Sequence, residues 1–249
     1  MRNDFNQSKY YNKAANILKL VRLFAVLLFV MFLLSCILVF RDSITLDNVQ
    51  YLMKYADFYD ASVAPDNAEI SISADSESQM LTIRDNLAVV SRSGIGLYEF
   101  SGHKLFNYNF SYSCPAVIHD DRNVLVYDIK GTGLSVFNSF SRVYSQEYPY
   151  GVKSACMSDS GIAIVTGDSS YRSVAIAYNS KFEEIFRWES AERYVISIDL
   201  SQDGTKLVCG AIKSVDGIYD SKIIVYDTRS GEIISECSIS DELILKVSF

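Results

Sequence analysis

The sequence predicts an all-β domain, a β-propeller of four-stranded blades, preceded by one transmembrane α-helix. A frame of Ser, two turn-forming residues, Gly, five mostly apolar residues and a second Gly stands at 158–167 and again at 201–210, an offset of 43 residues. A repeat of about 40 residues is typical of four-stranded blades. The chain also carries 17 Tyr and 14 Phe but only three Pro, a balance that favours strands.

Four apolar runs, each preceded by polar turn residues, supply the second strand of each predicted blade. They lie at 87–91, 124–128, 162–167 and 206–210. Continuous apolar runs of this length fit strands that are buried on both faces. One strand precedes each run and two follow it, so each repeat holds four strands. About four blades are therefore visible in the sequence.

Glycines mark the turns and strand ends of the repeat. We expect Gly161 and Gly204 to relax the turn before the second strand, and Gly167 and Gly210 to end that strand where side chains would crowd. Residues 211–221 are expected to be a polar insertion between two strands of the last repeat.

The N-terminal segments predict a membrane anchor. Residues 1–22 carry five Lys or Arg against one Asp, a net charge of +4, which leaves −11 on the rest of a chain whose total charge is −7. Residues 23–40 contain no charge and would span about 27 Å as a helix, close to the thickness of a bilayer core. Basic residues concentrate on the cytoplasmic side, so the N-terminus is expected inside the cell and the acidic part outside.

An alternative to the uncleaved anchor stays open at Cys36. The stretch Phe32–Cys36, "FLLSC", resembles a bacterial lipoprotein processing box in which Cys36 would carry the lipid. The four residues after Cys36 are apolar, whereas a lipidated cysteine normally opens a polar tether. Either reading tethers the following domain outside the cell membrane.

Residues 41–68 are expected to form a juxtamembrane helix and linker, and residues 69–249 the propeller. Thr45 can cap the helix, and the turn residues of Val63–Glu69 end it. The propeller region holds about four and a third repeats of the predicted length. Its last residues, Glu242–Phe249, read as the innermost strand of a fifth blade, so the chain is expected to be truncated. A variant with four blades would be closed by the early strand Glu69–Ser73.

The residues that usually carry catalysis or bind metals are sparse. His103 and His119 have no second ligand at metal spacing, and the acidic turns lack a calcium-loop pattern, so no metal or cofactor is expected. Nucleophile elbows and phosphate loops are absent from the sequence. A charge of −11 would repel nucleic acid. The four cysteines of the domain are expected to be small buried strand residues, although an exported domain would allow them to oxidise; they are Cys114, Cys156, Cys209 and Cys237.

A binding surface is therefore the expected functional feature. Ligands of propellers usually meet the loops that leave the outer strands and the loops between second and third strands. In this sequence those loops carry Tyr150, Tyr171, Arg172, Trp188 and Tyr219. Tyr, Trp and Arg are enriched where proteins bind partners, because they give large, stiff contact areas with polar tips.

Dipeptides of an aromatic residue and an acid or amide end the third strand of each predicted repeat. They are Tyr98-Glu99, Phe137-Asn138, Tyr178-Asn179 and Tyr226-Asp227, at intervals of 39, 41 and 48 residues. This ending resembles the Trp-Asp dipeptide of WD-type propeller repeats, although no Gly-His pair opens the blades. The whole layout is similar to an uncharacterised family of Gram-positive bacterial proteins, a domain of unknown function with one membrane helix and an exported WD-like or quinoprotein-like propeller. The resemblance implies a fold and supplies no catalytic residues.

The sequence thus predicts a single-pass membrane protein that displays a propeller outside the cell as a binding or scaffolding module. The expected partner is an envelope protein or a wall component, and the acidic domain favours basic partners. Two alternatives remain, an envelope enzyme that hydrolyses or cleaves glycans and a lipoprotein-type assembly factor. The enzyme would need a cluster of carboxylates or His at the central channel.

Overall fold

The computed structural model describes residues 17–32, 34–35, 78–100 and 104–249. The chain divides into two compact units, Met1–Asp60 and Ala61–Phe249. Several features expected from the sequence lie outside the described residues; these are Cys36, the helix and linker of 41–68, the strand Glu69–Ser73 and His103.

A helix is the only regular element described in the first unit, at residues 17–32 and 34–35. None of the helices in the described part of the chain is long and apolar enough to cross a membrane. The expected span of 23–40 includes residues outside that part, namely 33 and 36–40.

The described part of the second unit, residues 78–100 and 104–249, forms four antiparallel sheets, each made from four consecutive strands. Blade 1 comprises β1 (Gln79–Ile83), β2 (Asn86–Ser91), β3 (Gly94–Glu99) and β4 (Lys104–Asn109). Blade 2 comprises β5 (Pro115–His119), β6 (Asn123–Asp128), β7 (Gly133–Asn138) and β8 (Arg142–Glu147).

Blades 3 and 4 repeat this order. Blade 3 comprises β9 (Ser154–Ser158), β10 (Gly161–Thr166), β11 (Ser173–Asn179) and β12 (Glu184–Ser190). Blade 4 comprises β13 (Tyr194–Leu200), β14 (Lys206–Val215), β15 (Ile218–Asp227) and β16 (Ile233–Ser240). In every blade the strands pair in chain order, so each sheet is a simple meander.

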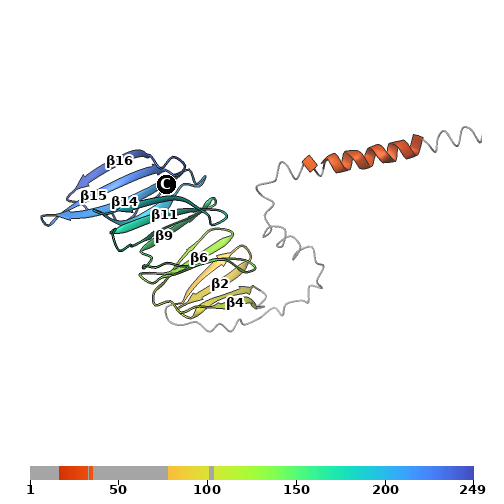
Figure 1. Cartoon of the computed structure of the whole chain (residues 1–249). Helices are drawn as coiled ribbons and strands as arrows, with labels where there is room; N and C mark the ends of the chain where they lie inside the picture. The colour runs from red at the N-terminus through yellow and green to blue at the C-terminus, as the bar shows by residue number, and fades with distance from the viewer. Residues whose placement is uncertain (1–16, 33, 36–77, 101–103) are drawn as a thin grey trace, which may run out of the picture. The chain divides into compact units, whose positions relative to one another are not determined.

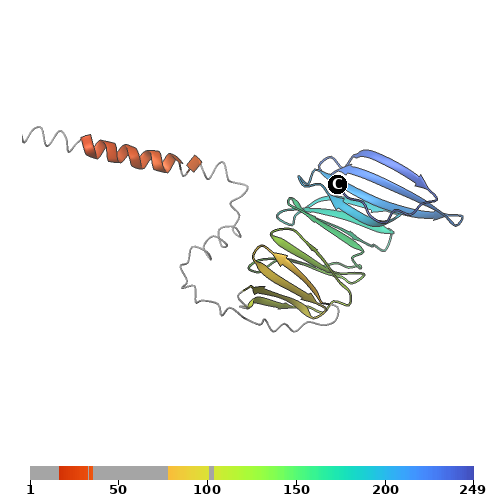
Figure 2. The ribbon, with the colours of Figure 1, turned by 180° about the vertical axis from the view of Figure 1, so that it is seen from behind.

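The blades stack through their first strands and their faces. Strand β5 contacts β2 and β9, and β13 contacts β9, β10 and β11. Figure 1 shows the sheets following one another in chain order from yellow to blue, and Figure 2 shows the same order from behind. Four-stranded meanders stacked with their first strands together are the arrangement of propeller blades, which confirms the predicted all-β propeller fold.

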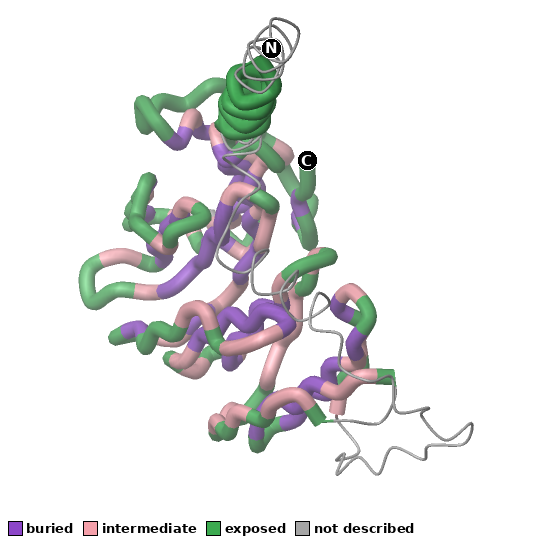
Figure 3. The backbone as a smooth tube through the Cα atoms, turned by 90° about the vertical axis from the view of Figure 1, so that its right-hand side faces the viewer, coloured by how far each residue is buried: buried purple, intermediate pink, exposed green. Residues whose placement is uncertain are grey.

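The apolar runs are second strands that bury both faces, as predicted. In β6, Val124 and Val126 pack with blade 1, whereas Leu125 and Tyr127 pack with blade 3. Strand side chains alternate between faces, so a central strand between two neighbours must be apolar at every position. Figure 3 shows this burial as purple segments inside the sheets, with green at the loops.

In blades 2 to 4, the aromatic residue of the repeated dipeptide packs near the outer strand of the preceding blade. Phe137 lies 5.6 Å from the ring of Tyr108, and Tyr226 lies 5.2 Å from the rings of both Phe186 and Trp188. Tilted aromatic pairs at such distances contribute about 0.5–1.5 kcal/mol beyond the burial of their area. The repeated aromatic therefore supplies the contact between neighbouring blades.

In blades 2 to 4, the acid or amide of the dipeptide stabilises the turn that follows. Oδ1 of Asn138 accepts hydrogen bonds from the backbone N–H groups of Phe140 and Ser141, both at 2.8 Å. Asp227 makes the same contacts with Arg229 and Ser230. Asn and Asp favour turns because their side chains bond the backbone a few residues ahead. This is the physical reason for the repeat of aromatic plus acid or amide.

The expected polar insertion at 211–221 is instead a long β-hairpin. Strands β14 and β15 continue into it, and their pairing runs out to Val215 and Ile218. Asp216 and Gly217 close the hairpin with φ values of 52° and 83°, as a two-residue turn of type I′ requires. The expectation that Gly210 ends its strand is therefore wrong, whereas the expected crowding is present. A Cβ at Gly210 would lie 3.1 Å from Ile244 and from Val247.

The segment Glu242–Phe249 covers the face of blade 4 that is turned away from blade 3. It is assigned to no strand, but Ile244 and Val247 are buried there with Val208. The same three-residue spacing of buried residues occurs at Val195 and Ile198, where blade 4 begins. The segment therefore packs on this face of blade 4 without strand pairing, and the innermost strand of a fifth blade stays a prediction.

Candidate functional site

Loops from three blades meet at one end of the sheets. The loops between second and third strands and those between successive blades emerge at this end, because the strands alternate in direction. Lys130 N–H donates to the Val152 carbonyl at 2.7 Å and so ties two of these loops together. We call this surface the blade rim; it comprises residues 148–153, 167–172, 191–194 and 213–220.

Two cations of the blade rim converge on one tyrosine ring. Nζ of Lys153 lies 5.5 Å from the centroid of the Tyr194 ring, and Cζ of Arg172 lies 5.1 Å from it. Nζ of Lys153 also donates to the carbonyl of Arg172 and, at 3.3 Å, to Oγ of Ser173. The three side chains come from three loops of blades 2 to 4, so the sheets fix their arrangement.

Tyr150 stands beside this group. Oγ1 of Thr166 donates to the Tyr150 carbonyl at 2.9 Å, which holds the loop between blades 2 and 3 against β10. A Cβ at Gly167 would lie 3.7 Å from the Tyr150 side chain and 3.9 Å from Nζ of Lys153, so these two residues flank Gly167. The Tyr150 side chain remains 38% exposed and is available for contact.

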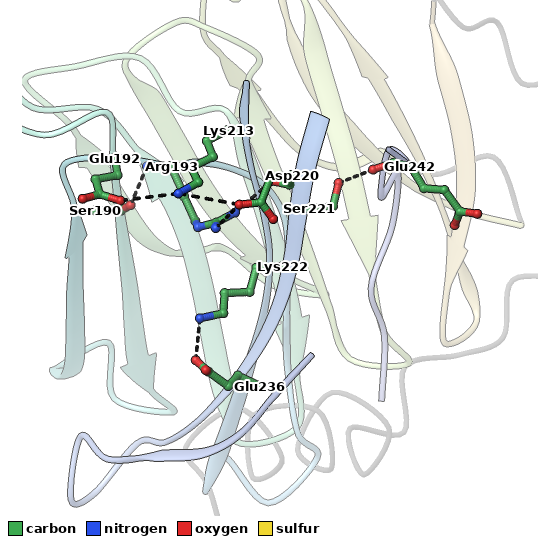
Figure 4. A network of polar contacts seen from close by, with 9 residues as sticks. All are labelled: Ser190, Glu192, Arg193, Lys213, Asp220, Ser221, Lys222, Glu236 and Glu242. Atoms are coloured by element: carbon green, nitrogen blue, oxygen red, sulfur yellow. Dashed lines mark hydrogen bonds and ion pairs between the residues drawn. The ribbon is translucent and has the colours of Figure 1, made fainter. Parts of the chain in front are cut away.

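An ion-pair network holds the blade 4 end of the rim. The guanidinium of Arg193 donates to the Asp220 carboxylate at 2.6 Å and to the Asp220 carbonyl at 2.8 Å (Figure 4). Lys213 lies 3.6 Å from the same carboxylate and 3.9 Å from Glu192. The hydrogen bond from Arg193 to the Asp220 carboxylate holds the pKa of Asp220 below its ordinary value. The network ties the loop after β12 to the β14–β15 hairpin.

Four of the five residues expected on the binding surface lie on the blade rim. Tyr150 lies next to Gly167, Tyr171 and Arg172 lie in the loop between β10 and β11, and the exposed Tyr219 lies in the hairpin next to Asp220. Trp188 does not join them. It was expected in a loop but lies in β12, half-buried against Tyr226 in the core between blades 3 and 4.

Two shifted pKa values describe the chemistry around Arg172. The neighbouring Glu189 carboxylate raises the pKa of the Tyr171 hydroxyl. Burial lowers the pKa of Lys153, because taking an ammonium group out of water disfavours its charged form.

Sequence reasoning missed Lys153, Tyr194 and the pair Arg193–Asp220. These residues meet only when different blades stack, and no local pattern reports such contacts. The Asp216-Gly217 dipeptide was the one signal available, since Asp-Gly between strand-forming residues is typical of a two-residue hairpin. A hairpin predicted from this dipeptide would place Tyr219 and Asp220 on a strand that returns toward the rim.

In the acidic turns at the opposite end, the Asp side chains bond the backbone of their own turns. Oδ1 of Asp120 accepts from the N–H groups of Arg122 and Asn123, both at 2.6 Å. In the later turn, Asp203 accepts from Ser201 and Thr205, which lowers the pKa of Asp203 to about 2. Within the described ranges, no three His, Cys, Asp or Glu side chains gather where they could hold a metal ion.

The cysteines divide into two classes. Cys156 and Cys209 are buried, as expected, whereas Cys114 and Cys237 are exposed, and all four are free thiols. Burial raises the pKa of Cys156 to about 12 and that of Cys209 further. The buried pair therefore stays protonated at ordinary pH, which makes these thiols poor nucleophiles.

Comparisons with solved structures return propellers of low similarity. The Neurospora crassa Pan2 WD40 domain matches with a TM-score of 0.45 and 13% identity, over 68% of this chain and 54% of that one. BamB from Moraxella catarrhalis matches with a TM-score of 0.45 and 18% identity, over 68% and 51%. The Dos1 propeller gives 0.47 and 12%, over 66% and 47%. This chain therefore spans about half the length of these proteins.

Sequence comparison places the chain in a family. No curated protein sequence matches it. A family model matches residues 59–249, which include the sixteen strands that the structure describes. The chain belongs to the DUF5711 family, a family of unknown function.

Proposed function

We propose that the propeller is an extracytoplasmic binding module, tethered to the cell membrane by the N-terminal segment, that presents the blade rim to a protein of the cell envelope. The observation that carries this proposal is the convergence of Lys153 and Arg172 on the Tyr194 ring, with Tyr150 beside them. Aromatic and Arg side chains held in place by a rigid scaffold lose little conformational entropy on binding, which favours recognition.

Rigid presentation is the mechanism of the proposed module. The rim loops are bound to the sheets, since Val195 N–H donates to Oγ of Ser173 at 3.0 Å and Arg172 N–H donates to the Ser190 carbonyl at 2.9 Å. Partner binding then needs little rearrangement of the loops.

The binding role is tested by photo-crosslinking in the native cells. A benzophenone amino acid replaces Tyr150 on the blade rim or, as a matched control, Arg122 in an exposed turn at the opposite end. We expect the Tyr150 site to crosslink one protein reproducibly and the Arg122 site not to do so. Equal crosslinking at both sites, or none at Tyr150, would overturn the binding role. Crosslinks to wall glycan alone would replace the protein partner by a wall component.

The location is tested separately. A phosphatase that folds only outside the cytoplasm is fused after Phe249 in the full chain. Activity in intact cells and sedimentation with membranes are expected. An inactive fusion, or a fusion found in the soluble fraction, contradicts the extracytoplasmic tether.

A further inference from the structure

The cations of the blade rim are neutralised unevenly. At the blade 4 end, Arg193 and Lys213 face the carboxylates of Asp220 and Glu192 within 4 Å. At the other end, neither Lys153 nor Arg172 has an ion-pair partner among the residues that the structure describes. At that end the rim therefore carries two positive charges without an ion-pair partner in the described residues.

Two carboxylates near the loop of Arg172 interact with other groups. The Glu189 carboxylate lies beside the Tyr171 hydroxyl, whose pKa it raises. Oδ1 of Asp168 accepts from the Ser170 N–H at 2.9 Å and from the Ser169 hydroxyl at 3.3 Å. The Asp168 carboxylate is thus held within its own loop, and neither carboxylate lies within ion-pair distance of the Arg172 guanidinium.

The two cations differ in what they offer to a ligand. Nζ of Lys153 uses donors on the Arg172 carbonyl and on Ser173, and it is partly buried. The Arg172 side chain is exposed, and its described contact is with the Tyr194 ring. A guanidinium held against an aromatic ring keeps its planar fork of N–H groups open, and that fork matches a carboxylate in two parallel hydrogen bonds.

We propose that Arg172 and Lys153 form the docking site for a carboxylate side chain of an acidic peptide segment, whose neighbouring residues lie on the ring of Tyr150. This inference rests on the proposed binding role of the blade rim and specifies the chemistry of its partner. The aromatic neighbours favour a peptide over a phosphate polymer, because tyrosine rings give contact area to side chains and backbone.

The net charge of the domain does not oppose such a segment at the site. Charges separated by more than about 8 Å are largely screened at physiological ionic strength. A short acidic segment therefore responds to the two cations that it contacts and much less to the distributed negative charge. The proposal thus places an acidic segment at this part of the rim, whereas the net charge of the whole domain favours basic partners.

The test measures binding of defined peptides to the purified full-length chain. Fluorescence anisotropy follows a labelled peptide of six residues, Glu-Glu-Tyr-Glu-Glu-Gly, and the same peptide with Lys in place of Glu. We expect the Glu peptide to bind more tightly than the Lys peptide. Arg172→Gln should weaken the Glu peptide about tenfold, and Arg172→Glu should reverse the preference. Arg229→Gln removes an exposed charge at the opposite end and is the matched control.

Two comparisons make the outcome decisive. Arg172→Lys keeps the charge and loses the fork, so it should bind the Glu peptide more weakly than the unaltered chain. Equal affinity for both peptides overturns the proposal, as does an equal loss of affinity for the Glu peptide in Arg172→Gln and Arg229→Gln. Binding of a glycerol phosphate polymer without binding of the Glu peptide also overturns it. Unchanged thermal unfolding of each variant excludes misfolding as the cause.

The same variants separate this inference from the broader binding role. If Arg172→Gln leaves the crosslink at the Tyr150 position unchanged, the partner binds without the carboxylate contact. The binding role then stands and the acidic-peptide inference fails. If no crosslink forms in the unaltered chain, the binding role itself fails.

Discussion

The backbone N–H of Phe249 donates a hydrogen bond to Oδ2 of Asp199 at 2.9 Å. A comparable contact occurs between blades 4 and 3, where the backbone of Leu200 in β13 approaches the thiol of Cys156 in β9. In addition, Val247 N–H donates to Oγ of Ser197 at 3.1 Å. Residues 242–249 therefore contact blade 4 as the first strand of blade 4 contacts blade 3.

Gly210 tests this packing. Replacement by Val places new atoms against Ile244 and Val247, whose side chains lie 3.1 Å from the position of a Cβ. We expect Gly210→Val to destabilise the domain by about 1–3 kcal/mol, as overpacking does. Hydrogen exchange should be faster at the amides of Val247 and Phe249.

Gly167→Val is the matched control, because the nearest atoms to its Cβ position are 3.7 Å away. It should leave the exchange of these two amides unchanged. If Gly210→Val also leaves them unchanged, the segment does not depend on contact with β14.

The blades could be predicted because their pattern is local and repeats. The second strand of each blade has to be apolar on both faces. The third strand of each blade ends in an aromatic residue followed by an acid or amide, and Asn138 and Asp227 cap the turns that follow them. Both requirements arise within about ten residues of sequence, so periodicity exposes them.

The chemistry of the rim could not be predicted in the same way. Lys153 and Tyr194 lie in different blades, and nothing in either segment points to the other. Trp188 was misplaced because an indole suits an exposed loop as well as a blade interface. Phe186 and Ser190, both buried on the same face of β12, were the signal for its true position.

Trp188 is the only tryptophan, so its fluorescence reports on the interface between blades 3 and 4. Tyr226→Ala removes a ring 5.2 Å from Trp188 and leaves a cavity. Loss of a large buried aromatic side chain costs about 3–5 kcal/mol. We expect a lower midpoint of urea unfolding, a red shift of the emission and stronger quenching by acrylamide. Ile185→Ala on the exposed side of the same strand should change none of these, and an unshifted emission in Tyr226→Ala would contradict the packing.

Gly217 tests the hairpin that carries Tyr219 and Asp220. Its φ of +83° lies in the left-handed region, and a Cβ there would meet nothing within 4 Å. Gly217→Ala should therefore destabilise the domain by about 1 kcal/mol through the backbone alone. Gly217→Asn should cost less, because Asn adopts this conformation more readily. Urea unfolding of the two variants measures the difference, and equal losses would argue against a backbone cause.

The buried thiol of Cys156 predicts how stability depends on alkaline pH. Burial raises its pKa from 9.0 to about 12 in the folded protein, with a further contribution from the nearby Asp199 carboxylate. Between these values the unfolded chain loses the thiol proton while the folded chain keeps it. The thiol therefore stabilises the fold fully below pH 9, and this contribution falls as the pH rises toward 12. The slope is at most about 1.4 kcal/mol per pH unit.

Cys156→Ala should flatten the dependence of the free energy of unfolding on pH between 9 and 11. Cys237→Ala is the control, because Cys237 is exposed and its removal should leave the slope unchanged. Urea unfolding at several pH values, with reductant present, compares the three chains. An equal slope in Cys156→Ala and the unaltered chain would mean that this thiol ionises as readily in the folded protein as in the unfolded one, and hence that the interface between β9 and β13 admits water.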